Sequence, residues 1–372
     1  AYAGSAAVTA AAAAGALVVA AALVGPFMTR IAAEFDHPLG PPVLRESVPM
    51  QRHDPASILV NGLRVAHTAL DSPLRPVAGA AANGIIDLAR LLGVDPLDRA
   101  TTFGATTFPV AAWYPDEDRA AFPITGGLAL VGVAIAVVAP RRITVAARVG
   151  RLRAFGAAVA ASVVLYVAVV KWQPWGNRLL LFAVVLAAPL AGLCLAALLR
   201  PAEARHDARP GDAHDEPGSG GPGRRTVATW LAGALLATAA LAGILSVGYG
   251  FPRRLVGPGS AVTADDWQIR FIRRPQWAEQ FRWAASAVEA TGARRVGLVQ
   301  QNDTWEYPWW LLLRNHEIVS LQSVLPHHPP PHPASVDAII CTGPRTVCVA
   351  VVPAGWRIHH RGYVGYALPP AR

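Results

Sequence analysis

The sequence contains little charge, little sulfur and almost no lysine. Asp, Glu, Lys and Arg make up only 15% of its 372 residues, whereas hydrophobic residues make up 53%. This composition lies outside the range of ordinary soluble domains and is typical of membrane proteins. The three cysteines are too few for a disulfide-rich scaffold. Lys171 is the only lysine, so its position has to be explained.

Five apolar runs are long enough to cross a bilayer, which takes roughly 17 to 25 residues. They cover 6–26, 124–140, 154–171, 179–199 and 227–248. The first run lacks the basic start of a signal peptide, so we interpret it as a span of a longer protein whose C-terminal portion is this chain. The expected fold class is an α-helical polytopic protein of the cell membrane, with about five transmembrane helices and the lipid bilayer as its surroundings.

The arginines indicate the orientation of the chain. The connector 141–153 has no acidic residue and carries five arginines, namely Arg141, Arg142, Arg148, Arg151 and Arg153. Because such connectors stay on the cytoplasmic side, we place this one inside. Alternation then puts 200–226 inside and 27–123, 172–178 and 249–372 outside the cytoplasm. Topology therefore accounts for these clustered cations, and no nucleic-acid partner is expected, although cations also bind phosphate backbones.

The outer segment 27–123 is predicted to contain two amphipathic helices. They group apolar side chains on one face each, with Ile58, Leu59, Leu63, Ala66 and Leu70 in 56–70, and Ile85, Ile86, Leu88, Leu91 and Leu92 in 76–93. We expect both helices to lie along the outer membrane surface, or alternatively to pack onto a soluble domain. The inner linker 200–226 is rich in Pro and Gly and has no apolar period, so we expect it to be disordered.

From about residue 262 the composition becomes that of a small extracytoplasmic α/β domain. A helix is predicted over 275–291 with Gly292 as its C-terminal cap, and a short helix within 304–316. Strands are predicted over 294–300, 317–324, 337–343, 346–352 and 361–368. Cys341 and Cys348 flank the turn 344–345 and would face each other on two hairpin strands. They form either a disulfide, which requires an oxidising compartment, or two buried thiols.

The connector between the third and fourth runs concentrates polar and aromatic side chains. These are Lys171, Trp172, Gln173, Trp175, Asn177 and Arg178. Anchoring at the level of the lipid headgroups explains the two tryptophans, but it does not explain two cations on the side where the positive-inside rule disfavours them. A guanidinium fork and an ammonium group beside amide donors can bind a lipid-linked phosphate. We therefore predict that these six residues form a donor-phosphate site.

Asp116, Glu117 and Asp118 are the densest group of outer carboxylates, directly before the run at 124. They are the predicted catalytic residues, because carboxylates can deprotonate an acceptor hydroxyl or hold a divalent metal. A solvated loop is the alternative. No cofactor is otherwise expected, since the histidines at 327, 328 and 332 lack companion metal ligands. The aromatic residues at 305, 307, 309 and 310 either stack on sugar rings or form the core of the domain.

Four stretches together resemble a known family of membrane enzymes. They are EFDHPLGPP (34–42), YPDEDRAAFP (114–123), KWQPWGNR (171–178) and DTWEYPWWLLL (303–313). They are similar to bacterial integral-membrane glycosyltransferases related to the dolichyl-phosphate-mannose protein mannosyltransferase superfamily, which has the GT-C fold. The resemblance covers most of the chain.

The resemblance implies transfer of a sugar from a polyprenyl-phosphate donor to an envelope acceptor on the outer face. Enzymes of this family commonly carry the catalytic carboxylate in their first outer loop. No Asp-x-x-x-Tyr-His stretch of that loop occurs in this sequence, so we expect the loop to lie upstream of Ala1. The alternative function is that of a non-enzymatic membrane protein that assembles or scaffolds the cell envelope.

Overall fold

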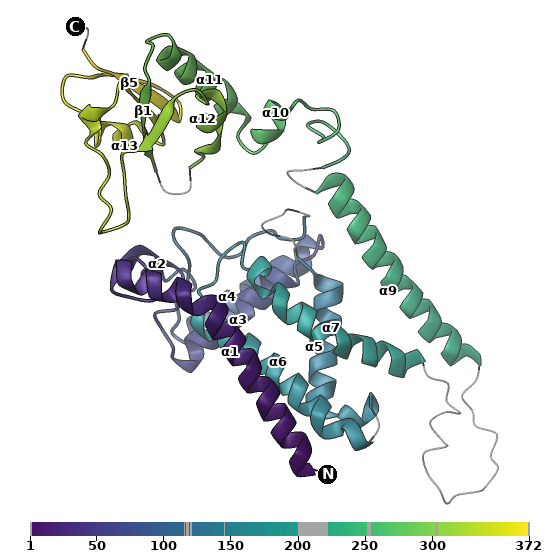
Figure 1. Cartoon of the computed structure of the whole chain (residues 1–372). Helices are drawn as coiled ribbons and strands as arrows, with labels where there is room; N and C mark the ends of the chain where they lie inside the picture. The colour runs from purple at the N-terminus through teal and green to yellow at the C-terminus, as the bar shows by residue number, and fades with distance from the viewer. Residues whose placement is uncertain are drawn as a thin grey trace, which may run out of the picture. The chain divides into compact units, whose positions relative to one another are not determined.

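The computed structural model (Figure 1) describes most of the chain, namely residues 2–114, 116, 119, 121–144, 146–199, 222–250, 254–301 and 304–370. The chain forms two compact units. One consists of Glu46–Thr263, and the other combines Ala1–Arg45 with Ala264–Arg372.

Four helices are long and apolar enough to cross a membrane, as judged by length and composition in the described part of the chain. They are α1 (Tyr2–Phe35), α6 (Val149–Val169), α7 (Asn177–Leu199) and α9 (Pro222–Tyr249). A fifth apolar helix, α5 (Pro123–Val138), has 16 residues and falls short of that length. Such helices are those of a membrane protein. The run predicted over 6–26 is part of a longer helix, because α1 continues to Phe35.

Helices α5, α6 and α7 pack through small residues. Gly126, Ala129, Gly132 and Ala136 recur every three or four residues along α5 and are buried. A Cβ atom on Gly132 would lie 2.8 Å from the backbone nitrogen of Ala191 in α7, so the two helix backbones touch there. Membrane helices associate through such close approaches, because apolar side chains gain little by leaving lipid for protein.

The two predicted inner connectors are shorter than expected. α6 begins at Val149, so the last arginines of 141–153 belong to the helix. Two short 3₁₀ turns, Pro140–Arg142 and Ala146–Arg148, precede α6. Of the linker predicted over 200–226, residues 200–221 lie outside the described residues. The prediction is wrong for its end, because α9 already begins at Pro222, where the fixed φ of proline favours a helix start.

The segment 27–123, which keeps the name outer segment from its predicted side, contains the two predicted short helices, α3 (Pro55–Ala69) and α4 (Arg75–Leu91), after the six-residue α2 (Pro42–Ser47). Asp54 caps α3, because its carboxylate accepts hydrogen bonds from the Ser57 N–H at 2.9 Å and the Ser57 hydroxyl at 2.7 Å. Helix α3 buries polar and apolar residues together, whereas Leu59 is 50% exposed. The buried residues are Ser57, Val60, Asn61, Arg64, Val65, Thr68 and Ala69. The apolar face that we expected on the membrane surface is therefore partly open.

The C-terminal unit contains the predicted small α/β domain. Its elements are α10 (Asp266–Arg270), α11 (Pro275–Glu289), β1 (Arg295–Gln300), α12 (Tyr307–Leu312), β2 (Glu317–Ser320), the 3₁₀ turn Pro333–Ser335, β3 (Ala338–Thr342), α13 (Arg345–Val349), β4 (Arg357–Arg361) and β5 (Val364–Leu368). The strand order is β2-β1-β3-β5-β4, with β1 parallel to β2 and β3, and β5 antiparallel to β3 and β4. α11 ends at Glu289, two residues before the predicted end, and Ala290 is its C-cap; Gly292 follows with a positive φ of 70° in the turn to β1.

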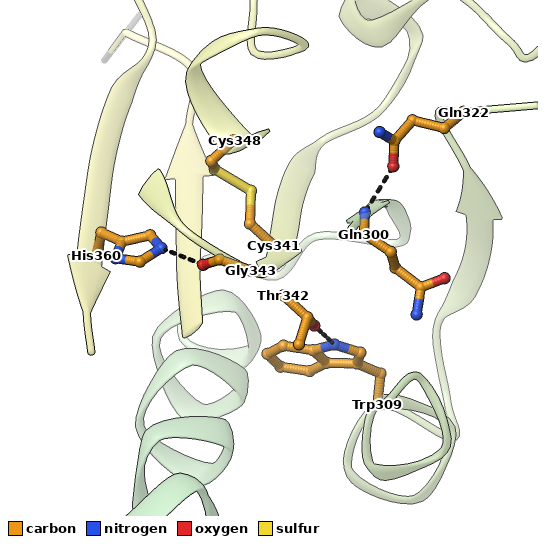
Figure 2. Close-up of a disulfide and its surroundings, with 8 residues drawn as sticks. All are labelled: Gln300, Trp309, Gln322, Cys341, Thr342, Gly343, Cys348 and His360. Atoms are coloured by element: carbon orange, nitrogen blue, oxygen red, sulfur yellow. Dashed lines mark hydrogen bonds between the residues drawn. A yellow bond between two sulfur atoms is a disulfide. The ribbon is translucent and has the colours of Figure 1, made fainter. Parts of the chain in front are cut away.

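The prediction of a strand over 346–352 is wrong. That run forms the short helix α13 and a turn, because a brief apolar stretch fits a helix and a strand equally well by periodicity. The Cys341–Cys348 disulfide therefore joins the end of β3 to α13, with 5.6 Å between the two Cα atoms (Figure 2). The strand predicted over 361–368 begins only at Val364, and the preceding strand β4 has the charged sequence RIHHR, which lacks apolar alternation.

Candidate functional site

The connector between α6 and α7 is fixed from both sides by the outer segment. The Lys171 N–H donates to the Val48 carbonyl at 3.0 Å. On the other side, the Trp172 N–H donates to the Thr101 carbonyl at 3.1 Å, and the Trp172 carbonyl accepts from the Phe103 N–H at 3.0 Å. The connector thus runs as an extended strand between two stretches of the outer segment. Its backbone conformation is determined by residues far away in the sequence.

Trp172 is a core residue of this unit. It is only 1% exposed, and its indole N–H donates to the Thr68 hydroxyl at 3.0 Å. Its ring packs edge-on against Phe108, with 5.4 Å between the ring centroids. The headgroup-anchor interpretation is therefore wrong for Trp172, because a buried ring cannot reach a membrane surface. Trp175 is half-buried and packs edge-on against Phe103 at 5.4 Å.

Arg64 is the centre of the polar contacts around the connector, and sequence reasoning missed it. The side chain is fully buried, and its guanidinium lies 5.8 Å from the Trp172 ring. Its nitrogens donate to the Pro96 carbonyl at 2.6 Å and to the carbonyl and hydroxyl of Thr101 at 3.1 Å each. Further donations reach the Thr102 hydroxyl at 2.8 Å and the Asn61 side-chain oxygen at 3.4 Å.

Burial lowers the pKa of Arg64 to about 10, while the nearby carboxylates of Asp95 and Asp98 act in the opposite direction. Arg64 therefore stays charged at neutral pH. A sequence signal for this role exists, because Ser57, Asn61, Arg64 and Thr68 form a polar stripe at spacings of three and four residues along α3. When the opposite face of the helix is apolar, such a polar stripe is normally predicted to face solvent. Only its long-range partners show that it is buried.

The two cations of the connector have different surroundings. Lys171 is 4% exposed, and its ammonium donates to the backbone carbonyl of Glu46. Burial lowers the pKa of Lys171, against the opposing charges of Asp98 and Glu46. Arg178, by contrast, is exposed in the first turn of α7. The ammonium of Lys171 thus points into protein, whereas Arg178 is an exposed residue.

The remaining predicted phosphate-site residues are buried amides. Asn177 donates from its side-chain nitrogen to the Thr68 carbonyl at 3.0 Å, which ties the start of α7 to α3. Gln173 is 5% exposed. The structure therefore brings the six predicted residues together on one connector. It buries four of them, leaves Trp175 half-buried and exposes Arg178.

Among the predicted catalytic acids, only Asp116 belongs to the described residues. It is 8% exposed and lies shortly before α5. Glu117 and Asp118 lie outside the described residues. A second buried carboxylate, Asp71, was not predicted. It accepts from the N–H groups of Ala112 at 2.7 Å and Trp113 at 3.1 Å, so it fixes the stretch before the acids to the end of α3.

An apolar cavity of about 330 Å³ lies between α3 and the helices α5, α6 and α7. Ala66, Leu130, Val163 and Val184 contribute one wall residue from each of these four helices. Within the described residues, no group of three or more His, Cys, Asp or Glu side chains is placed to hold a metal ion. A metal at 116–118 stays a prediction, because two of those three acids are not described.

Comparison with known proteins identifies no relative of this chain. The chain matches no protein-family model, no curated protein and no solved structure.

Proposed function

We propose that this chain is the C-terminal portion of a GT-C-type membrane glycosyltransferase. It would transfer a sugar from a polyprenyl-phosphate donor to an acceptor on the extracytoplasmic face. The observation that carries the proposal is the fixed polar connector at the ends of α6 and α7, which presents the exposed Arg178. Burying several polar groups costs free energy unless each is hydrogen-bonded. A connector that needed only to join two helices would not require these buried polar side chains.

The chemistry of the connector suits a phosphate headgroup. Arg178 can offer two parallel N–H donors to phosphate oxygens. It lies in the first turn of α7, where backbone N–H groups and the helix dipole favour an anion. In this proposal Arg178 contacts the phosphate, and Lys171 positions the connector through the Glu46 carbonyl. Fixed donors of this kind stabilise a phosphate leaving group without having to reorganise.

Two further features support the proposal. The apolar cavity between α3, α5, α6 and α7 has the chemistry that an isoprenoid chain requires. The Cys341–Cys348 disulfide fits an oxidising compartment for the C-terminal unit, as the extracytoplasmic topology demands. The proposed topology has five spans, with α5 as the shortest, and the arginine-rich turns between α5 and α6 in the cytoplasm. Asp116 is the described candidate for activating the acceptor hydroxyl.

The rival function is a non-enzymatic scaffold of the cell envelope. The burial of Trp172 and Lys171 favours it, because core packing alone can account for both side chains. The two functions differ at Arg178, whose exposed guanidinium has a ligand in the enzyme and needs none in a scaffold.

Replacing Arg178 in the full-length protein tests the proposal. We expect Arg178→Gln to lower sugar transfer at least tenfold, because the phosphate loses its charged fork, a loss of about 1.4 kcal/mol or more in transition-state stabilisation. The measurement is transfer from a panel of polyprenyl-phosphate monosaccharides in proteoliposomes. Arg178→Lys should recover part of the rate. Lys171→Met should instead lower the thermal midpoint, because the Glu46 carbonyl loses its charged donor and keeps only the hydrogen bond from the Gln51 side chain.

Arg52→Gln is the matched control, because Arg52 is a partly exposed arginine of the outer segment that pairs with Asp54. It should leave transfer unchanged. Full transfer by Arg178→Gln would remove the phosphate-site proposal. A wild-type protein that inserts and assembles normally but transfers none of the sugars would favour the scaffold.

The proposed topology is tested by labelling single cysteines in intact cells. Glu289→Cys lies at the exposed end of α11, and Arg151→Cys lies at the exposed start of α6. The native cysteines are a suitable background, since Cys341 and Cys348 are joined and Cys194 is buried. A membrane-impermeant maleimide should label Glu289→Cys in intact cells and Arg151→Cys only after lysis. The reverse pattern would overturn the orientation.

A further inference from the structure

The C-terminal unit has a large open cleft at the amino-terminal edge of its parallel strands. Its volume is about 780 Å³. The turn between α11 and β1 and the stretch before β3 form two of its walls. The start of β4 and the chain after β5 form the others. All residues that line the cleft fall within 291–370, so none of them comes from a membrane helix.

The opposite edge of the sheet is the place where open α/β sheets usually bind ligands, between parallel strands whose connections diverge. In this domain that place lies between the ends of β1 and β3. There the Gln301 N–H donates to the Thr342 carbonyl at 3.0 Å, and the Gln301 side chain accepts from the Tyr363 hydroxyl at 3.0 Å. A Cβ atom on Gly343 would lie 3.1 Å from that of Gln301. The described side chains at this edge therefore pack against one another.

The walls of the cleft combine an aromatic ring with cations. Trp356 is half-buried, packs against the core cluster around Cys341 and Cys348, and also lines the cleft. Arg294 and Arg357 are exposed and line the same cleft. In the part of the chain that the structure describes, neither arginine forms a salt bridge.

The acidic side chain of the cleft is already engaged. The Asp337 carboxylate accepts from the N–H groups of Arg294 and Arg295 at 2.9 Å each, and the Asp337 N–H donates to the Arg295 carbonyl at 2.8 Å. The hydrogen bonds that the carboxylate accepts lower the pKa of Asp337, and the one from the Arg295 N–H has the largest effect. They also join the turn before β1 to the start of β3, so the wall that carries Arg294 is held in place.

We propose that this cleft binds an acidic saccharide. The indole of Trp356 provides an apolar surface for the face of a sugar ring, and Arg294 and Arg357 provide forks for its carboxylate or phosphate group. Ser335 lines the same cleft, and a serine hydroxyl can both donate to and accept from a sugar hydroxyl group. The proposal goes beyond glycosyl transfer and holds equally for a scaffold, because the site belongs to the α/β unit alone.

Binding to defined oligosaccharides tests the proposal. The full-length protein in nanodiscs is titrated with hexagalacturonate, with a phosphorylated mannan fragment and with neutral maltohexaose at about 0.15 M salt, which screens distant charges. At least one acidic saccharide should bind tenfold more tightly than maltohexaose. Preference for the first shows carboxylate recognition, and preference for the second shows phosphate recognition. Equal affinity for all three, or no binding, would overturn the proposal.

Variants then locate the site. Arg294→Gln combined with Arg357→Gln should weaken acidic-saccharide binding at least tenfold and leave the thermal midpoint unchanged. Trp356→Leu should weaken binding while keeping an apolar side chain against the core. Arg361→Gln is the control, since Arg361 is an exposed arginine at the other end of β4. An equal loss in Arg361→Gln, or unchanged binding in the double variant, would contradict the assignment to this cleft.

Discussion

Replacing Arg64 with alanine is expected to destabilise the connector and the outer segment by about 3 to 5 kcal/mol, because each hydrogen bond to a charged group contributes about 1.5 to 3 kcal/mol and several are lost together. The guanidinium is fully buried and donates five hydrogen bonds. Without it, the Pro96 carbonyl keeps only the Thr102 hydroxyl as a donor and the Thr101 carbonyl keeps only the Trp172 N–H, so both lose their hydrogen bond to a charged group. The loop before Phe103 would lose its link to α3, and with it one side of the connector.

The measurement is the thermal midpoint of the purified protein in detergent, followed by the monodisperse fraction that remains after heating. Arg64→Ala should lower the midpoint strongly. The midpoint of Arg64→Lys should lie between those of the wild type and Arg64→Ala. Lysine keeps the charge but lacks the planar fork that reaches several acceptors.

Arg52→Ala serves as the matched control for Arg64. Arg52 pairs with Asp54 at 3.3 Å and with Asp98 at 3.7 Å, but its side chain is 40% exposed. Exposed pairs of this kind contribute at most about 1 kcal/mol. A midpoint that falls equally in Arg52→Ala and Arg64→Ala would show that Arg64 has no special structural role.

The elements that the sequence predicted well are those determined by short-range rules. The apolar runs 154–171 and 179–199 are helices because their length and composition leave few other options in a membrane. Helix α3 covers nearly the range 56–70 predicted from its apolar spacing, and it begins at Pro55 with Asp54 as its cap. Strands β1 and β3 are apolar on both faces and buried between helices, which makes them recognisable as runs.

The surroundings of the candidate site could not be predicted, because they depend on contacts between distant segments. Thr68 and Trp172 are 104 residues apart in sequence, yet they share a hydrogen bond. Nothing within the connector shows that α3 will cover it with a polar face. Sequence alone therefore treated Lys171 and Arg178 as equivalent cations. The structure separates them, because only long-range packing decides which of the two is buried.

The same limit explains the error at α13. Cys341 and Cys348 were expected to face each other across a hairpin, and the disulfide does form between them. The spacing of the two cysteines predicted that their sulfurs can meet. It did not determine the secondary structure of the backbone between them. Trp309, one of the aromatic residues for which sugar stacking and core packing were both possible, is buried. Its indole N–H donates to the Thr342 hydroxyl at 2.9 Å (Figure 2). Core packing, and not sugar stacking, accounts for that ring.

Substituting Gly132 with leucine is expected to separate α5 from α7 and to cost about 3 kcal/mol or more, at the upper end for overpacking. A Cβ atom at this position would lie 2.8 Å from the Ala191 nitrogen and 2.9 Å from the Leu190 carbonyl carbon. Both are backbone atoms of α7, so no side chain can rotate away to make room. The helices would have to move apart and leave gaps along the small-residue face of α5.

Gly127 provides a control on the same helix, because no atom lies within 4 Å of the Cβ position there. Both substitutions add the same side chain and the same helix propensity to α5. A difference between them therefore measures packing alone. Gly132→Leu should reduce the yield of monodisperse protein and its thermal midpoint, whereas Gly127→Leu should leave both near wild type. Similar behaviour of the two variants would mean that the contact between α5 and α7 does not hold these helices together. The cavity that they share with α3 and α6 would then have no stable walls.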